Sequence, residues 1–276
     1  MIRDDLLLIG AALAGGAINS VAGGGTLLTF PALQAVLGSS AAMIRVANYT
    51  STVALMPGSL AGAWGYRREL AQSRRWIMLL AAPSLLGGIV GSLLLTELPA
   101  EAFAGLVPWL ILTAALLFAL QPRLARWLGI GQPHAEPKRS TVVGIVLFQF
   151  LVATYGGYFG AGIGILMLAA LAMMGLQDIH VMNGLKTLFA SLINGVSAVW
   201  FTVRGDVEWR SAGIMMVSAI AGGYLGARVA RRLNRNVVRN GVVAIGVLLA
   251  AAEFSEQFLG LPVFELISGS AAEPAE

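Results

Sequence analysis

The sequence predicts an all-α integral membrane protein built from two inverted repeats, each a broken or re-entrant helical hairpin followed by three transmembrane helices. Three observations predict this fold: the composition, a series of long charge-free segments, and an internal repeat. The 276-residue chain is 57% hydrophobic and only 12% charged, with a mean hydropathy of +0.79. Since a soluble domain is about one-quarter charged, lipid must cover much of this surface.

The first repeat begins with Leu6–Ile44, a stretch nearly twice the length of one span and charged only at its flanks. A helix needs ~20 apolar residues to cross a bilayer. Three consecutive glycines from Gly23 to Gly25 interrupt the stretch, where a straight helix would be costly. We therefore predict a helical hairpin, or a broken helix, that bends inside the bilayer. Three ordinary spans follow, over Val46–Tyr66, Trp76–Thr96 and Ala102–Pro122.

The second repeat begins in the same way, with the uncharged stretch Ser140–Gln177. Its glycines predict a second hairpin or broken helix. Three shorter spans follow and reach the required length if flanking Lys and Arg side chains extend to the headgroups. The interrupting glycines are Gly156, Gly157, Gly160, Gly162 and Gly164, and the three spans are Thr187–Val203, Ser211–Ala227 and Asn240–Ala252.

The two halves align with each other at an offset of 135 residues, without a gap. At this offset Gly25 meets Gly160 and Asn48 meets Asn183. Internal repeats of this kind recur in transporters. We therefore divide the chain into an N-terminal repeat over 6–120, a cytoplasmic linker over 121–140, a C-terminal repeat over 141–258 and an external acidic tail over 259–276.

Charge bias orients the chain. Most of the 18 basic residues fall in segments 67–75, 123–139 and 228–239, which are expected to be cytoplasmic. Both termini are then external, and we assign Glu253 and Glu256 to the external acidic end. The second half starts on the opposite side from the first, so the repeats are inverted. We expect a multi-pass protein of the bacterial inner membrane.

The chain offers little for catalysis. It has no cysteine, and its two histidines lie far apart, so no metal site, cofactor or catalytic group is expected. Only Lys186 is expected as an ionisable residue inside a span, where a charge costs several kcal/mol without a role or partner. It is either a lysine whose amine returns to the headgroups or a fixed positive charge for an anionic substrate.

The two breaks are the predicted substrate site. Exposed N–H groups and the positive end of a half-helix attract anions, and glycine lets the backbone approach a ligand. Close helix packing of small residues is the alternative for glycines, as expected at Gly87/Gly91 and Gly222/Gly226, and interhelical hydrogen bonding is the alternative for the polar side chains. The predicted binding residues are Gly23, Gly24, Gly25, Thr26, Asn48, Thr50 and Ser51, together with Gly160, Ala161, Gly162, Asn183, Lys186, Thr187 and Asn194.

Specific motifs resemble the TauE/SafE sulfite exporter family over nearly the whole chain. They are the glycine-rich segment Tyr155–Ala169, the segment Gly175–Leu188 with its Asn-x-x-Lys motif, and, in the first half, Asn19–Thr26 with Ala47-Asn48-x-Thr50. The resemblance implies a bacterial inner-membrane transporter for small anions, with sulfite and organosulfonates as named substrates. At Ser51-Thr52 the sequence departs from the family pattern, in which an amide residue and a basic residue are common at these two positions. A second intramembrane cation is therefore absent here.

We therefore expect a secondary active transporter, not an enzyme, that moves sulfite, an organosulfonate or a related carboxylate by alternating access. An anion channel and a membrane assembly or structural protein remain as alternatives. No ATP-binding motif is present, so an ion gradient or the membrane potential would drive transport; H⁺ and Na⁺ both stay open as the coupling ion. The lack of intramembrane Asp or Glu argues against a carboxylate proton relay. The expected partners are the substrate and the lipid bilayer, without nucleic acid, and a homo-oligomer is left open.

Overall fold

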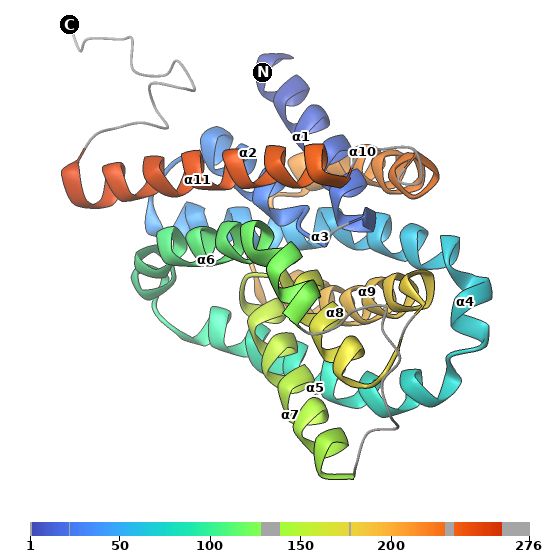
Figure 1. Cartoon of the computed structure of the whole chain (residues 1–276). Helices are drawn as coiled ribbons and strands as arrows, with labels where there is room; N and C mark the ends of the chain where they lie inside the picture. The colour runs from blue at the N-terminus through green and yellow to red at the C-terminus, as the bar shows by residue number, and fades with distance from the viewer. Residues whose placement is uncertain (1, 22, 128–138, 177, 230–234, 261–276) are drawn as a thin grey trace, which may run out of the picture.

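The computed structural model describes residues 2–21, 23–127, 139–176, 178–229 and 235–260, and their regular structure is entirely α-helical (Figure 1). The helices are α1 Ile2–Val21, α2 Thr26–Leu37, α3 Ala41–Gly65, α4 Arg67–Ala71, α5 Arg74–Glu97, α6 Ala100–Trp127, α7 Arg139–Tyr158, α8 Ile163–Met173, α9 Ile179–Arg204, α10 Trp209–Val229 and α11 Arg235–Leu259.

Five of the described helices, α5, α6, α7, α9 and α11, are long and apolar enough to cross a membrane. Helices α3 and α10 were also expected as spans; they contain 25 and 21 residues but fall outside this group. For α3 the reason is its buried polar face. It lies between α2, α9 and α10, so its polar side chains contact protein instead of lipid.

Both long uncharged stretches are broken, as predicted. The first break separates α1 from α2, and the second separates α7 from α8. Gly23, Gly160 and Gly162 have φ values of 78°, 85° and 78°, a left-handed conformation that L side chains rarely adopt. The second break is narrower than the glycine pattern suggested, because Gly156 and Gly157 lie inside α7 and Gly164 lies inside α8.

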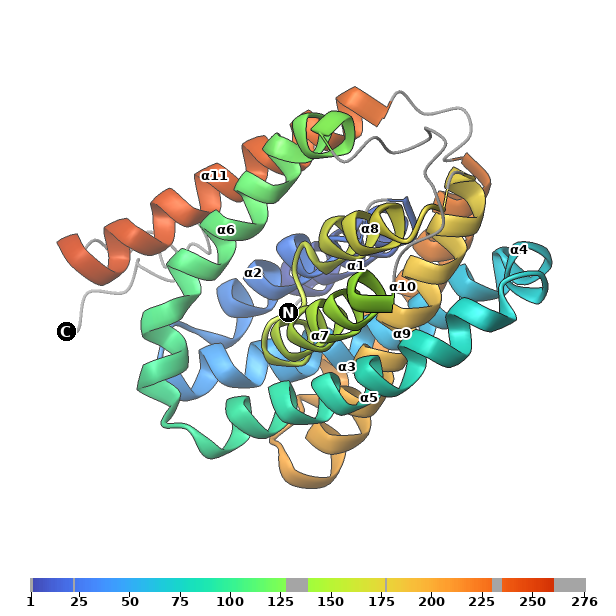
Figure 2. The ribbon, with the colours of Figure 1, turned by 60° about the horizontal axis from the view of Figure 1, so that its bottom comes forward.

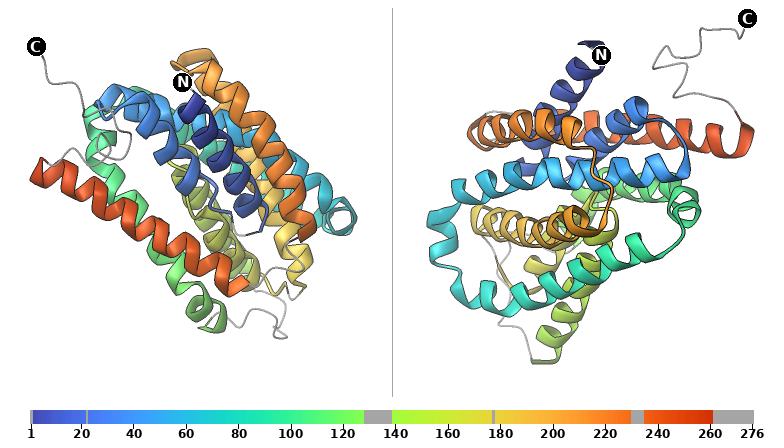
Figure 3. Two further views of the ribbon diagram at one scale, coloured as in Figure 1. Left: turned by 90° about the horizontal axis from the view of Figure 1, so that it is seen from above. Right: turned by 180° about the vertical axis from the view of Figure 1, so that it is seen from behind.

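Each broken stretch is a hairpin. A Cβ atom added to Gly15 of α1 would lie 2.9 Å from Thr29 Cγ2 of α2 and 3.1 Å from the Gly25 carbonyl oxygen. Helix α2 therefore folds back along α1, as seen from above (Figure 3, left). Helices α7 and α8 lie side by side (Figure 2) and share one buried apolar cluster that includes Val152 and Met167.

Glycines also allow close packing between the two halves. Gly87 and Gly91 of α5 lie against the backbone of α7, and Gly222 and Gly226 of α10 lie against the backbone of α1. A Cβ atom at any of these positions would collide with main-chain atoms of the neighbouring helix. The predicted packing role of these glycines is thereby confirmed.

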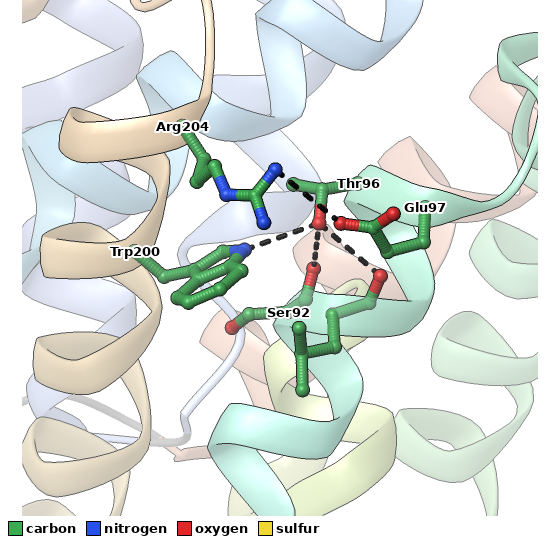
Figure 4. Close-up of polar contacts among 6 residues, drawn as sticks. Ser92, Thr96, Glu97, Trp200 and Arg204 are labelled. Carbon is green, nitrogen blue, oxygen red and sulfur yellow. Dashed lines mark hydrogen bonds and ion pairs between the residues drawn. The ribbon is translucent and has the colours of Figure 1, made fainter.

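Polar contacts join α5 to α9 near one end of the bundle (Figure 4). Trp200 Nε1 donates to Thr96 Oγ1 over 3.1 Å, and Thr96 Oγ1 donates to the Ser92 carbonyl. The Arg204 guanidinium lies 3.7 Å from the Glu97 carboxylate and 5.3 Å from the Trp200 ring centroid. Because Arg204 and Glu97 are both exposed, their ion pair contributes little, and the partly buried hydrogen bond between Trp200 and Thr96 matters more.

The assignment of Glu253 and Glu256 to the external acidic end is wrong for their structure, because both lie within α11. Glu253 is 5% exposed. The preceding sequence is an uncharged apolar run, and the helix continues past it for two further turns to Leu259. A buried carboxyl group therefore lies in one of the described helices that are long and apolar enough to cross a membrane. The tail itself, from residue 261 onward, lies outside the described residues.

Candidate functional site

The tips of the two hairpins meet inside the bundle. A Cβ atom added to Gly23, at the first tip, would lie 2.8 Å from Gly164 Cα at the start of α8. A Cβ atom added to Gly160, at the second tip, would lie 3.6 Å from Thr26 Oγ1 at the start of α2. Each tip thus lies against the first turn of the other hairpin's second helix.

The N-terminal ends of α2 and α8 have no side-chain cap, a feature that they share with α4 and α5 but not with α3 and α9. The capping positions are Gly25 and Gly162, and neither supplies a side-chain hydrogen bond. By contrast, Ser40 caps α3 and Asp178 caps α9. The first N–H groups of a helix have no acceptor within it, and its N-terminus carries a partial positive charge. Two such ends near one point favour a negatively charged ligand.

The second tip is held by Asn48 of α3. Asn48 Nδ2 donates to the Tyr158 carbonyl oxygen, the last of α7, over 3.0 Å. The side chain is 1% exposed, and among the described residues its Oδ1 atom has no hydrogen-bond partner. One of the two Nδ2 hydrogens is used in this bond, so Asn48 stabilises the break, and its second N–H group and Oδ1 are left for other partners.

Asn194 of α9 completes the second tip. Its Oδ1 atom lies 4.0 Å from the position that a Cβ atom on Gly160 would occupy. Asn194 and Thr26 are 9% and 8% exposed. The structure therefore brings Thr26, Gly160 and Asn194 together, from one helix of the first half and two elements of the second.

The first tip lies next to a different part of α9. A Cβ atom added to Gly62 of α3 would lie 3.3 Å from Thr187 Cγ2 and 3.6 Å from Ser20 Cβ, just before the first break. Nearby, Asn19 Nδ2 donates to Ser59 Oγ over 2.7 Å. The end of α1 is thus fixed against α3 and α9 by small and polar side chains.

Lys186 is completely buried, with 0% of its surface exposed. Its amine does not extend to the headgroups in this structure, and its interaction partners lie within the protein. The snorkelling interpretation is therefore wrong for this conformation. A lysine enclosed in a membrane protein is costly without partners and commonly marks a substrate or ion pathway.

Polar side chains form a stripe along one face of α9, and all of them are buried as the stripe passes both tips: Asn183, Lys186, Thr187, Ser191 and Asn194. Asn183 and Asn194 are separated by about 16 Å along the helix, at 1.5 Å per residue. Thr187 Oγ1 and Ser191 Oγ each donate to the carbonyl four residues earlier, at 2.7 Å. These two hydroxyls are satisfied by their own helix, so the asparagines and Lys186 carry most of the stripe's capacity to bind a ligand.

Several predicted binding residues pack against helices that surround the hairpin tips. Gly24 faces the Phe118 ring and Gly162 faces Ala114, both on α6, and Ala161 is fully buried. The Ser51 hydroxyl pairs with the Thr29 hydroxyl at 2.6 Å. These residues pack the tips in place.

Thr50 lies away from the tips, towards the loop between α9 and α10. Its hydroxyl accepts a hydrogen bond from the Glu208 backbone N–H over 3.1 Å. Burial alone would raise the pKa of Glu208, but hydrogen bonds from Ser211 and Arg210 at the start of α10 hold that pKa below its usual value. Thr50 therefore anchors the beginning of α10.

Sequence reasoning missed a cavity elsewhere in the bundle. It has a volume of about 340 Å³ and lies between the end of α2, the start of α3, the start of α6 and the end of α11. The missed signal is Glu253, a carboxyl group that follows an apolar helical run. Within the described residues, no group of three or more His, Cys, Asp or Glu side chains is arranged to hold a metal ion. The polar lining residues are Gln34, Ser39, Glu101, Glu253, Glu256 and Gln257.

Comparisons with known proteins agree on the class of protein. The family described as Sulfite exporter TauE/SafE matches residues 7–252. A "Probable membrane transporter protein" of Haemophilus influenzae is 28% identical over 87% of this chain and 90% of its own length. "Probable membrane transporter protein YfcA" of Escherichia coli K12 is 26% identical over 89% and 87%, and "Probable membrane transporter protein ORF9" of a Sinorhizobium species is 25% identical over 87% and 88%. No solved structure matches the chain.

Proposed function

Because this chain belongs to the sulfite exporter TauE/SafE family, a family of multi-pass membrane proteins whose matched relatives are named as transporters, we propose that it is a secondary active transporter for a small anion. The observation that carries this proposal is the meeting of the two hairpin tips. There, the uncapped N-termini of α2 and α8 approach each other among buried polar side chains.

The substrate is an oxyanion small enough to fit between the tips: sulfite, an organosulfonate or a related carboxylate. Backbone N–H groups from both breaks contact it, and Asn183, Asn194 and Lys186 on α9 contribute donors. The positive helix ends and the lysine each favour negative charge. Asn48 acts as a positioning residue, since its amide already bonds the end of α7.

Transport proceeds by alternating access between two inverted repeats, over 6–120 and 141–258. Two observations support the repeat. Helices α5 and α10 begin 135 residues apart, as do α6 and α11. The packing is also reciprocal, because α1 packs against α10 while α7, its counterpart, packs against α5. Each hairpin therefore packs against a helix of the opposite repeat, and a rotation of one repeat relative to the other would pivot at the hairpin tips.

The orientation follows the charge bias. The basic segments face the cytoplasm of a bacterium, and both termini and the turn from Glu97 to Glu101 face outward. The linker over 121–140 is cytoplasmic. The start of α2 then lies deep in the bilayer, while its C-terminal end lies near the outer surface.

Flux measurements in proteoliposomes test this function. Labelled sulfite, taurine-like sulfonates and small carboxylates are offered to the wild type, to Lys186→Met and to Arg68→Met, which removes an exposed positive charge. We expect saturable flux of at least one anion. Since a charged hydrogen bond contributes about 1.5–3 kcal/mol, Lys186→Met should weaken apparent affinity by roughly 10- to 150-fold. Arg68→Met should match the wild type.

Three outcomes would contradict the proposal. Saturable anion flux that is unchanged in Lys186→Met would remove this lysine from the site. Flux that never saturates with substrate would favour a channel. Absence of flux for every anion tested, in protein that remains folded, would favour an assembly or structural role.

A further inference from the structure

The cavity between α2, α3, α6 and α11 has an acidic lining with one buried wall. Glu253 forms this wall and is 5% exposed, while Glu101 and Glu256 lie towards the opening. None of the described residues that line the cavity is basic. A buried carboxylate without a neutralising charge is costly, since its desolvation is several kcal/mol.

Gln34 of α2 is an independent sign that a ligand belongs there. It lines the same cavity and is 1% exposed, yet neither atom of its amide makes a hydrogen bond among the described residues. The amide lies beside the Glu253 carboxyl group, whose Oε1 atom also lacks a partner. Buried polar atoms are nearly always satisfied by protein, water or an ion. Gln34 Nε2 can donate to the adjacent Glu253 carboxylate, whereas Gln34 Oε1 and the remaining carboxylate oxygen still call for a positively charged or hydrogen-donating occupant.

We propose that this cavity binds the coupling cation and that Glu253 is its principal ligand. This proposal rests on the transporter function above. Two sources of positive charge fit the same oxygens. A proton on Glu253 would let the carboxylic acid donate to Gln34 Oε1. A sodium ion would be bound by oxygen atoms of Glu253, Gln34 and the Ser39 hydroxyl, which are the ligands that hard cations prefer.

Helix α2 provides the physical connection between cation and anion. Its first residue, Thr26, lies at the hairpin tips, and Gln34 lies about 12 Å further along the same helix, at 1.5 Å per residue. A cation that neutralises Glu253 draws the end of α2 towards α11. Thr26 and Gln34 belong to the same 12-residue helix, so a displacement of its C-terminal end is transmitted, through the turn that contains Pro31, to its N-terminus at the anion site.

Thermal unfolding of the purified full-length protein tests cation binding without any substrate. The midpoint is measured for the wild type, Glu253→Gln and Glu69→Gln, which removes a carboxylate outside the cavity. One series replaces choline chloride with sodium chloride at constant ionic strength; a second varies pH in sodium-free buffer. Saturating ligand should raise the wild-type midpoint by about 5 °C.

The two sources give different patterns. If sodium is the ligand, sodium raises the wild-type midpoint; if the proton is the ligand, acidification raises the midpoint of the wild type relative to Glu253→Gln. In either case Glu253→Gln, an uncharged isostere, should lose that response, and Glu69→Gln should keep it. The same response in the wild type and in Glu253→Gln, to both sodium and pH, would overturn the proposal.

A transport series tests the link to the anion. Vesicles loaded in turn with radiolabelled sulfite, a taurine-like sulfonate or a small carboxylate measure exchange, which needs no net driving force, and accumulation driven by a sodium or pH gradient. Glu253→Gln should retain exchange and lose gradient-driven accumulation, and gradient-driven accumulation equal to wild type would contradict coupling at Glu253. If the wild type carries no anion, the transporter function fails, whereas the cavity's cation binding is still decided by thermal unfolding.

Discussion

Gly23→Ala should be strongly destabilising, because the first hairpin tip requires glycine for two separate reasons. Its φ of 78° lies in the left-handed region, which costs an L residue about 1–2 kcal/mol. The added Cβ atom would also lie 2.8 Å from Gly164 Cα, a backbone atom that cannot rotate away. Overpacking of this kind costs about 1–3 kcal/mol. Together these effects predict a loss of roughly 2–5 kcal/mol.

The assay is thermal unfolding in detergent, followed by intrinsic fluorescence. At about 2 °C per kcal/mol for a chain of this size, Gly23→Ala should lower the midpoint by roughly 4–10 °C. Gly213→Ala is the matched control, since Gly213 lies in α10 with no atom within 4 Å of the added Cβ and no positive φ. Because alanine favours a helix, Gly213→Ala should leave the midpoint equal or slightly higher.

Equal midpoints for Gly23→Ala and Gly213→Ala would refute the close contact between the two tips. Gly160→Ala should give an intermediate result. It has a φ of 85°, but its added Cβ atom meets no atom closer than the Gly156 carbonyl oxygen at 3.2 Å. A loss of about 1–2 kcal/mol is therefore expected from the backbone alone.

Three further predictions concern contacts around the site. Asn48→Ala should lower the unfolding free energy by about 1–3 kcal/mol, because the last carbonyl of α7 loses its buried donor; an unchanged thermal midpoint would contradict this. Trp200→Phe should cost about 1 kcal/mol through its lost hydrogen bond to α5, whereas Glu97→Gln should cost at most a few tenths in the same melts; the reverse order would be evidence against the partly buried bond. Because folding lowers the pKa of Glu208, its carboxylate stabilises the folded protein above the usual pKa of 4.5, and this stabilisation is lost as pH falls through the folded pKa. Thermal melts of the wild type should therefore show an acid-induced fall in the midpoint that Glu208→Gln lacks.

The hairpins could be predicted from sequence because glycine runs interrupt charge-free stretches too long for one span. The break between α1 and α2 falls at the predicted glycines, and the packing glycines of α5 and α10 were recognised from their spacing. The second break was less well located. Five glycines lie near it, but only Gly160 and Gly162 adopt positive φ, and sequence alone does not separate those from glycines that a neighbouring helix approaches.

The binding site was harder to predict than the fold, because the sequence does not determine which of several possible partners each polar side chain bonds. Asn48 and Thr50 are two positions apart, yet one bonds the end of α7 and the other the start of α10. Lys186 could not be separated from a snorkelling lysine until its burial was known. Glu253 was misassigned because charge counting marks where an uncharged run ends, whereas α11 continues beyond that point.

The proposed anion site at the hairpin tips is tested most directly by chemical protection of Thr26→Cys, since the chain has no native cysteine. The rate of modification by a small thiol reagent is measured with and without each candidate anion, beside Ser39→Cys in the separate cavity. We predict that at least one of sulfite, a sulfonate or a carboxylate slows modification at position 26 but not at position 39. Equal rates at position 26 with and without every anion would contradict the account.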